Sequence, residues 1–187
     1  DAQAGSYREV WRNPYFRRMT PIGFFCYGGV LAMQTLWAGP WMVRVAGYSP
    51  AQAASGLFTI NVAMLVTFWC WGLVSPRLGV RGWDTNRLIT WGQPLSFLAM
   101  GWLIVAGSDA GAWSWTLFFV TSTCVALAQS AVGMAFAPAQ AGRALSAYNL
   151  VIFVGIFVVQ WGIGLLIDGF QALGLGEGAS FRAAMAV

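Results

Sequence analysis

Long hydrophobic runs without a charged side chain follow one another along the chain. A helix that crosses a bilayer needs about 20 such residues. Five runs reach this length, at residues 19–43, 51–74, 88–108, 112–136 and 144–167. A sixth run begins at about residue 181. Because buried helices of soluble proteins seldom follow one another at this length, the pattern predicts an all-α, polytopic transmembrane helical bundle over residues 19–187. Residues 1–18 are expected to form a cytoplasmic segment that leads into the first span.

Composition supports this prediction and excludes several classes of protein. Hydrophobic residues make up 58% of the 187 residues and charged residues 9%, against about 25% charged residues in soluble domains. A soluble enzyme and a disordered segment are therefore excluded. The three cysteines, Cys26, Cys70 and Cys124, are odd in number and lie in hydrophobic runs. They are expected to be small buried side chains and not a disulfide framework.

Arginine is unevenly distributed between the two sides of the predicted bundle. Eight arginines share one side: Arg8, Arg12, Arg17, Arg18, Arg77, Arg81, Arg87 and Arg143. Only Arg44 and Arg182 fall on the other, so the positive-inside rule predicts a cytoplasmic amino terminus. Complete use of Arg in place of Lys, with abundant Ala and Gly, is typical of a GC-rich bacterial genome, so we expect a multi-pass protein of the bacterial inner membrane. The arginines form no continuous basic face, which argues against nucleic-acid binding.

Reactive side chains are missing from the spans. The chain has no His and no Lys, and no carboxylate or guanidinium lies inside any of the five runs. Proton carriers, metal ligands and nucleophile–base pairs all need such groups. We therefore expect no enzymatic activity, no catalytic residue, no metal site and no cofactor.

A few amides and aromatic residues interrupt the hydrophobic runs. Tyr27, Gln34 and Trp41 recur every seven residues, which places them on one helix face. The candidate cavity residues are Tyr27, Gln34, Trp37, Asn61, Gln129 and Asn149. These side chains suit a mostly apolar pocket with a few polar contacts. Alternatively, each amide bonds to a neighbouring helix for about 1 kcal/mol or less. Gly155 and Gly162 face away from Asn149 and are expected to allow close helix approach.

The segment between the second and third runs combines glycine with arginine. We expect a short inner loop here, which contains Gly72, Arg77, Gly79 and Arg81. Gly79 can adopt a positive φ in such a loop. The two guanidinium groups can bond the carbonyls that end a neighbouring helix, where the helix dipole favours cations. The loop is therefore expected to fasten adjacent helix ends together.

This segment resembles the second copy of the loop signature of the major facilitator superfamily, Gly-x-x-x-Asp-Arg-x-Gly-x-Arg, with Pro76 in place of the acid that the first copy carries. Residues 10–18 resemble the entry to that family's carboxyl-terminal half, and 141–144 followed by Asn149 resemble the turn into its eleventh span. The resemblance covers nearly the whole chain. It implies spans seven to eleven and the start of the twelfth, with an amino-terminal six-span half as partner.

The resemblance also implies a function. In that family the two halves rock about a site near the midplane and move a small solute by alternating access. The first, second, fourth and fifth spans would then border the cavity, with Gln34, Asn61, Gln129 and Asn149 as substrate contacts and the Arg77–Arg81 loop as part of the inner gate. Pro76 argues against a charge relay through this loop. The alternative is a non-transporting membrane scaffold or subunit that packs on partner helices.

Overall fold

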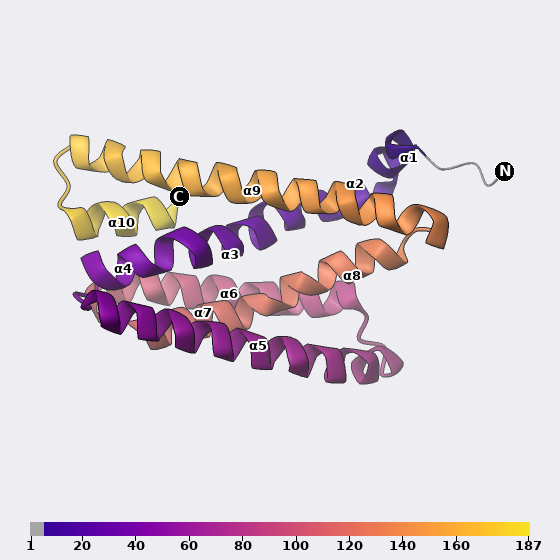
Figure 1. The fold of residues 1–187 in the computed structure, drawn as a ribbon, viewed down its shortest axis with the longest axis horizontal. Helices are drawn as coiled ribbons and strands as arrows, with labels where there is room; N and C mark the ends of the chain where they lie inside the picture. Colours follow the sequence, from indigo (N-terminus) through magenta and orange to yellow (C-terminus); the bar gives the residue numbers. More distant parts are fainter. Residues whose placement is uncertain (1–5) are drawn as a thin grey trace.

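The computed structural model describes residues 6–187, which are helical and contain no strand. The first five residues of the predicted cytoplasmic segment lie outside the described residues. Five helices are long and apolar enough to cross a membrane: Pro14–Arg44, Pro50–Val80, Thr85–Asp109, Ala112–Met134 and Pro138–Ala172. They run back and forth in one bundle (Figure 1). The predicted all-α fold with five such helices is confirmed, and it is typical of a multi-pass membrane protein.

The first long helix is not a uniform α-helix. It follows the short helix α1 (Tyr7–Arg12) and contains three α-helical pieces: α2 (Pro14–Pro21), α3 (Gly28–Ala32) and α4 (Ala38–Arg44). Two π-helical segments, Ile22–Tyr27 and Met33–Trp37, connect these pieces. A π-helix joins residues five apart instead of four, so its turns are wider. Residues seven apart are therefore not all kept on one face along this helix.

The remaining helices differ from the predicted runs mainly at their ends. They are α5 (Pro50–Val80), α6 (Thr85–Ala106), α7 (Ala112–Ser122), α8 (Leu127–Met134), α9 (Pro138–Ala172) and α10 (Glu177–Ala186). A 3₁₀ turn, Gly107–Asp109, follows α6, and the 3₁₀ segment Thr123–Ala126 joins α7 to α8. Both α5 and α9 extend beyond the predicted runs at each end. The last helix begins at Glu177, before the predicted start at about residue 181.

Helix starts are set by local capping. Ser49 and Gln52 form a reciprocal capping box ahead of α5, and the Asp84 carboxylate accepts a 2.9 Å hydrogen bond from the Arg87 N–H at the start of α6. Pro138 occupies the first turn of α9. A proline at this position costs no hydrogen bond, since the first N–H groups of a helix have no partner within it.

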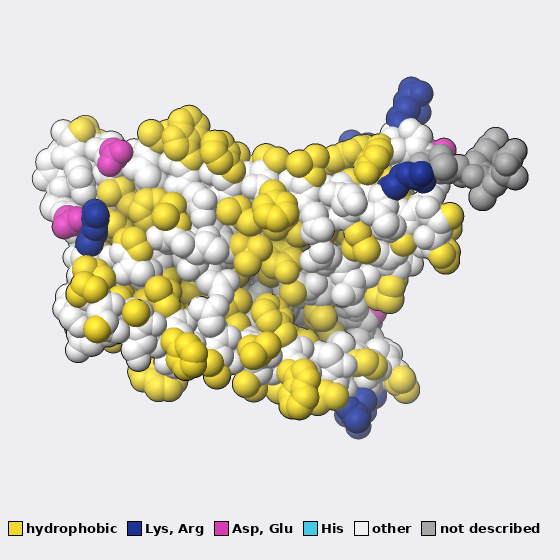
Figure 2. All heavy atoms as spheres, viewed as in Figure 1, with side chains coloured by type: hydrophobic (Ala, Val, Ile, Leu, Met, Phe, Trp, Pro, Cys, Tyr) yellow, Lys and Arg dark blue, Asp and Glu magenta, His cyan; other side chains and the backbone are white. Residues whose placement is uncertain are grey.

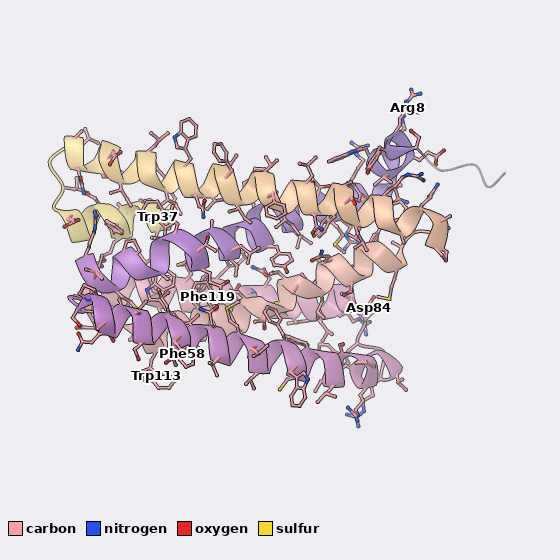
Figure 3. All side chains as sticks on the ribbon, in the orientation of Figure 1. Arg8, Trp37, Phe58, Asp84, Trp113 and Phe119 are labelled. Carbon is pink, nitrogen blue, oxygen red and sulfur yellow. The ribbon has the colours of Figure 1, made fainter. Side chains whose placement is uncertain are left out.

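The helices form a bundle with α6 behind α7 and α8 in the view of Figure 1. There, α9 lies along the first long helix, and α5 packs on α7 and α4. One buried cluster surrounds Trp41 and Trp115, and another surrounds Phe16 and Tyr148. Outside these clusters, many large apolar side chains point away from the bundle, among them Phe58 and Trp113 (Figure 3). Lipid or a partner protein is needed to cover so much apolar surface.

Charged side chains gather at the two ends of the bundle, and the band between them is uncharged on the face shown in Figure 2. At the end near the amino terminus, Gln140 donates a 2.8 Å hydrogen bond to Glu9, and the Tyr15 hydroxyl donates one of 3.2 Å to Asn86. At the opposite end, Arg44 forms an ion pair with Glu177 at 3.2 Å. This separation is the one expected where lipid surrounds the middle of a bundle.

Gly82, and not Gly79, requires a positive φ in the turn after α5. Gly82 has a φ of +82°, whereas Gly79 is helical, and a Cβ added at either would meet no atom within 4 Å. Gly82→Ala is expected to lower the free energy of unfolding of the full-length protein by about 1–2 kcal/mol, the cost of a left-handed residue. Gly79→Ala should raise it by up to about 1 kcal/mol, because alanine favours a helix. Thermal unfolding in detergent measures both, and the reverse order would contradict this turn.

Candidate functional site

A hollow of about 260 Å³ brings together three of the predicted site residues, Tyr27, Gln34 and Asn61. We call it the Gln34 hollow. Tyr27 and Gln34 come from the two π-helical segments of the first span, and Asn61 comes from α5. Apolar side chains form most of the remaining wall: Val30, Leu31, Met64, Leu65, Phe68, Val125 and Ala126. Such a wall with few polar groups is typical of a small-molecule site.

The two amides of the Gln34 hollow bond to each other. Gln34 Nε2 donates a 3.0 Å hydrogen bond to Asn61 Oδ1, and Asn61 Nδ2 donates one of 2.7 Å to the Leu57 carbonyl. A carboxamide has one acceptor oxygen and two N–H donors. The Gln34 carboxamide oxygen and one N–H of each amide thus keep hydrogen-bonding capacity beyond these two bonds. The pair can hold a solute that offers both a donor and an acceptor.

Two hydroxyl groups complete the wall at the end of α7. The Ser122 hydroxyl donates to the Phe118 carbonyl at 2.7 Å. The Thr123 hydroxyl accepts a 2.9 Å hydrogen bond from Trp71 Nε1 on α5. Thr123 was not predicted as a site residue, and the signal for it was the run of hydroxyl side chains at 121–123 within an uncharged stretch. This bond fastens α5 to the 3₁₀ segment beside the hollow.

Gln129 and Asn149 form a second amide pair away from the Gln34 hollow. Gln129 Nε2 donates a 2.8 Å hydrogen bond to Asn149 Oδ1, which connects α8 to α9. Gln129 lines a different hollow of about 440 Å³ with side chains of α8 and the start of α9. The predicted substrate contacts are therefore divided between two places, and each amide pair also joins two helices.

Trp37 lines neither the Gln34 hollow nor the hollow beside Gln129. Its indole ring packs edge-on against Phe181 of α10, with ring centroids 6.0 Å apart. It lines a third hollow, of about 370 Å³, between the first span and α9, which we call the Trp37 hollow. Trp41, the last member of the predicted seven-residue stripe, is fully buried and donates from its Nε1 to the Ala110 carbonyl at 3.1 Å.

The prediction that the gate residues form a short loop between two helices is wrong. Gly72, Arg77 and Gly79 lie within α5, and Arg81 is the residue that caps the end of this helix. Arg77 donates a 2.5 Å hydrogen bond to the Leu73 carbonyl of its own helix, so it does not fasten a neighbouring helix end. The helix continues to Val80 although Pro76 has no N–H to donate within it. The turn itself is held by Arg87, which donates 2.9 Å to the Gly82 carbonyl.

Within residues 6–187, no three His, Cys, Asp or Glu side chains lie close enough together to hold a metal ion. Comparison with known protein families, curated proteins and solved structures finds no match to this chain. The fold and the site therefore define a class only: a helical protein with five helices able to cross a membrane and a mostly apolar, amide-bearing hollow lined by three of them.

Proposed function

We propose that the chain is the carboxyl-terminal half of a secondary transporter of the major facilitator type, which moves a small solute by alternating access. The observation that carries the proposal is the Gln34 hollow. There, Tyr27, Gln34 and Asn61 from two separate spans face one mostly apolar space, where a solute can exchange hydrogen bonds with the amides. Polar groups inside a membrane bundle are costly and mark functional sites.

The arrangement of the helices supports the same proposal. The first, second and fourth spans line the Gln34 hollow, the fifth packs on the first, and α6 lies behind them (Figure 1). The long apolar face of α5 then suits contact with lipid and with an amino-terminal six-span half, and α10 would be the start of a twelfth span. The arginine-rich end, at which α1 lies, would face the cytoplasm of a bacterial cell.

Substituting either amide of the Gln34 hollow tests this function. In proteoliposomes holding the full-length transporter, Gln34→Leu or Asn61→Leu is expected to lower the initial rate of solute uptake about 5- to 10-fold, since one hydrogen bond to the solute contributes about 1 kcal/mol. Gln93→Leu is the matched control because it removes an amide from α6, outside this hollow. Unchanged uptake and unchanged solute affinity in both hollow variants would remove these residues from the site.

A non-transporting membrane scaffold is the second candidate. It is favoured by one observation: each of the two amide pairs already bonds across helices, Gln34 with Asn61 and Gln129 with Asn149. Such bonds can serve packing alone. If radiolabelled sugars, amino acids and amines neither accumulate nor exchange in proteoliposomes, while Gln34→Leu lowers the thermal stability, the scaffold is the better description.

A further inference from the structure

The Trp37 hollow differs from the Gln34 hollow in its chemistry. Three aromatic rings border it: Trp37 from the first span, and Phe157 and Trp161 from α9. A carboxylate, Asp168, lines the same hollow, and no residue lines both hollows. Figure 3 shows Trp37 beside α4, at the end of the bundle where α10 lies. Aromatic faces beside a carboxylate are the chemistry that attracts organic cations.

The backbone of α9 builds one side of the Trp37 hollow. Phe157, Trp161 and Asp168 are four and seven residues apart, so they lie on one helix face. The Phe157 and Trp161 rings are nearly parallel, with an interplanar angle of 19° and centroids 6.4 Å apart. Both are largely exposed, at 66% and 62%. Both side chains are therefore accessible from outside the bundle.

Gly164 allows Trp37 to form the opposite side. A Cβ added at Gly164 would stand 3.7 Å from the Trp37 ring, so the ring packs directly over the helix backbone. The Trp37 N–H is buried and has no hydrogen-bond acceptor among the described residues. Buried donors are nearly always paired. Because this N–H has no accessible surface, Trp37 offers the hollow its ring and not a hydrogen-bond donor.

The charges around the Trp37 hollow favour a cation. No guanidinium lines it, and Asp168 takes part in no ion pair within residues 6–187. The nearest arginine of the first span, Arg44, is already paired with Glu177. Gln160 also lines the hollow and donates its Nε2 to Thr35 at 2.8 Å, which leaves its carboxamide oxygen as an acceptor. An anion would meet the carboxylate and aromatic faces, both of which repel it.

We propose that the Trp37 hollow binds an organic ammonium group, with Asp168 as its counter-ion and Trp37, Phe157 and Trp161 as the aromatic faces around it. A methylated ammonium fits best, because its methyl groups contact the rings while the charge is attracted to the ring faces. Binding of such a compound does not depend on the proposed function. The further step, that the bound compound is also the transported solute, rests on the proposed function.

Choline and its uncharged isostere, 3,3-dimethylbutan-1-ol, test the proposal in the purified full-length protein by isothermal titration calorimetry. Choline is expected to bind at least tenfold more tightly than the isostere, because the two differ in charge and hardly in shape. Asp168→Asn and Trp161→Leu should each weaken choline binding about tenfold. Equal binding of the two compounds, or choline affinity unchanged in both variants, would overturn the site.

Matched controls lie at the same end of the bundle. Asp109→Asn removes a carboxylate from the turn after α6, and Trp113→Leu removes an indole that is 79% exposed on α7. Neither residue lines the Trp37 hollow, so choline affinity should be unchanged in both. A loss as large as that of Asp168→Asn would show that general surface charge, and not this site, attracts the cation, and would also overturn the proposal.

An ammonium group can come from a soluble amine or from a lipid headgroup, since the hollow lies near one end of the span. Choline titrations in nanodiscs of anionic lipid and of phosphatidylcholine separate the two sources. Equal affinity in both indicates a soluble cation, and loss of free-choline binding only in phosphatidylcholine indicates that headgroups occupy the site. Choline binding without uptake of any solute would support the ammonium site and contradict the proposed transport. Uptake of other solutes without choline binding would support the proposed transport and contradict the ammonium site.

Discussion

Replacing Gly155 with leucine is expected to lower the thermal unfolding midpoint of the full-length protein in detergent by about 4–8 °C. Gly155 lies where the backbones of α9 and the first span approach closely. A Cβ at this position would contact the Phe24 carbonyl oxygen and stand 2.9 Å from its carbon, and a Cβ on Gly28 would stand 3.0 Å from the Gly155 Cα. Backbone atoms cannot rotate away, so the helices would have to separate. Overpacking of this kind costs about 2 kcal/mol.

The control for this substitution lies one heptad along the same helix. A Cβ on Gly162 would meet nothing within 4 Å, so Gly162→Leu should leave the midpoint unchanged or raise it slightly through helix propensity. The expectation that both glycines allow close approach is thus confirmed for Gly155 and wrong for Gly162. Equal midpoints for the two leucine variants would contradict the Gly28–Gly155 contact.

The membrane-length helices could be predicted because their signal depends on length and composition alone. Twenty uncharged, apolar residues are recognisable whatever they pack against. The ends of the helices could not be predicted in this way. Helix α5 continues past the apolar run, through Pro76 to Val80, because hydrogen bonding within a helix does not require apolar side chains. A glycine–arginine segment that resembles a loop therefore belongs to a helix.

The candidate site was predicted in part, and the errors have a common cause. The stripe of Tyr27, Gln34 and Trp41 assumed a regular α-helix. Tyr27 and Gln34 do line one hollow, but Trp41 is buried against Ala110. Two π-helical segments change the direction in which successive side chains point. No residue type marks these segments, both of which pack against α9.

A similar break separates the polar residues of the fourth span. Ser122 and Gln129 would share a face on a continuous α-helix, but the 3₁₀ segment Thr123–Ala126 lies between them. They consequently line different hollows. The pairing of Gln129 with Asn149 joins residues 20 positions apart in the chain. Sequence identified which amides are costly in a membrane but not which amide bonds to which.

Trp41→Ala is expected to have the largest effect on stability, a loss of about 3–5 kcal/mol and about 10 °C in the thermal midpoint. Trp41 is fully buried at the end of the first span, and its ring meets Trp115 edge-on at 5.9 Å. Its removal would leave a large cavity beside α7 and an unpaired Ala110 carbonyl in the turn that connects α6 to α7. The measurement is thermal unfolding of the full-length protein in detergent.

Phenylalanine variants separate the hydrogen bond from the packing. Trp41→Phe keeps an aromatic ring but removes the 3.1 Å bond to the Ala110 carbonyl. Trp115→Phe makes the same chemical change at a fully buried indole whose N–H has no acceptor among the described residues. Trp41→Phe should therefore be the more destabilising by about 1 kcal/mol, the net contribution of one buried hydrogen bond. Equal losses in the two variants would mean that packing alone fixes Trp41, and that the turn before α7 does not depend on this bond.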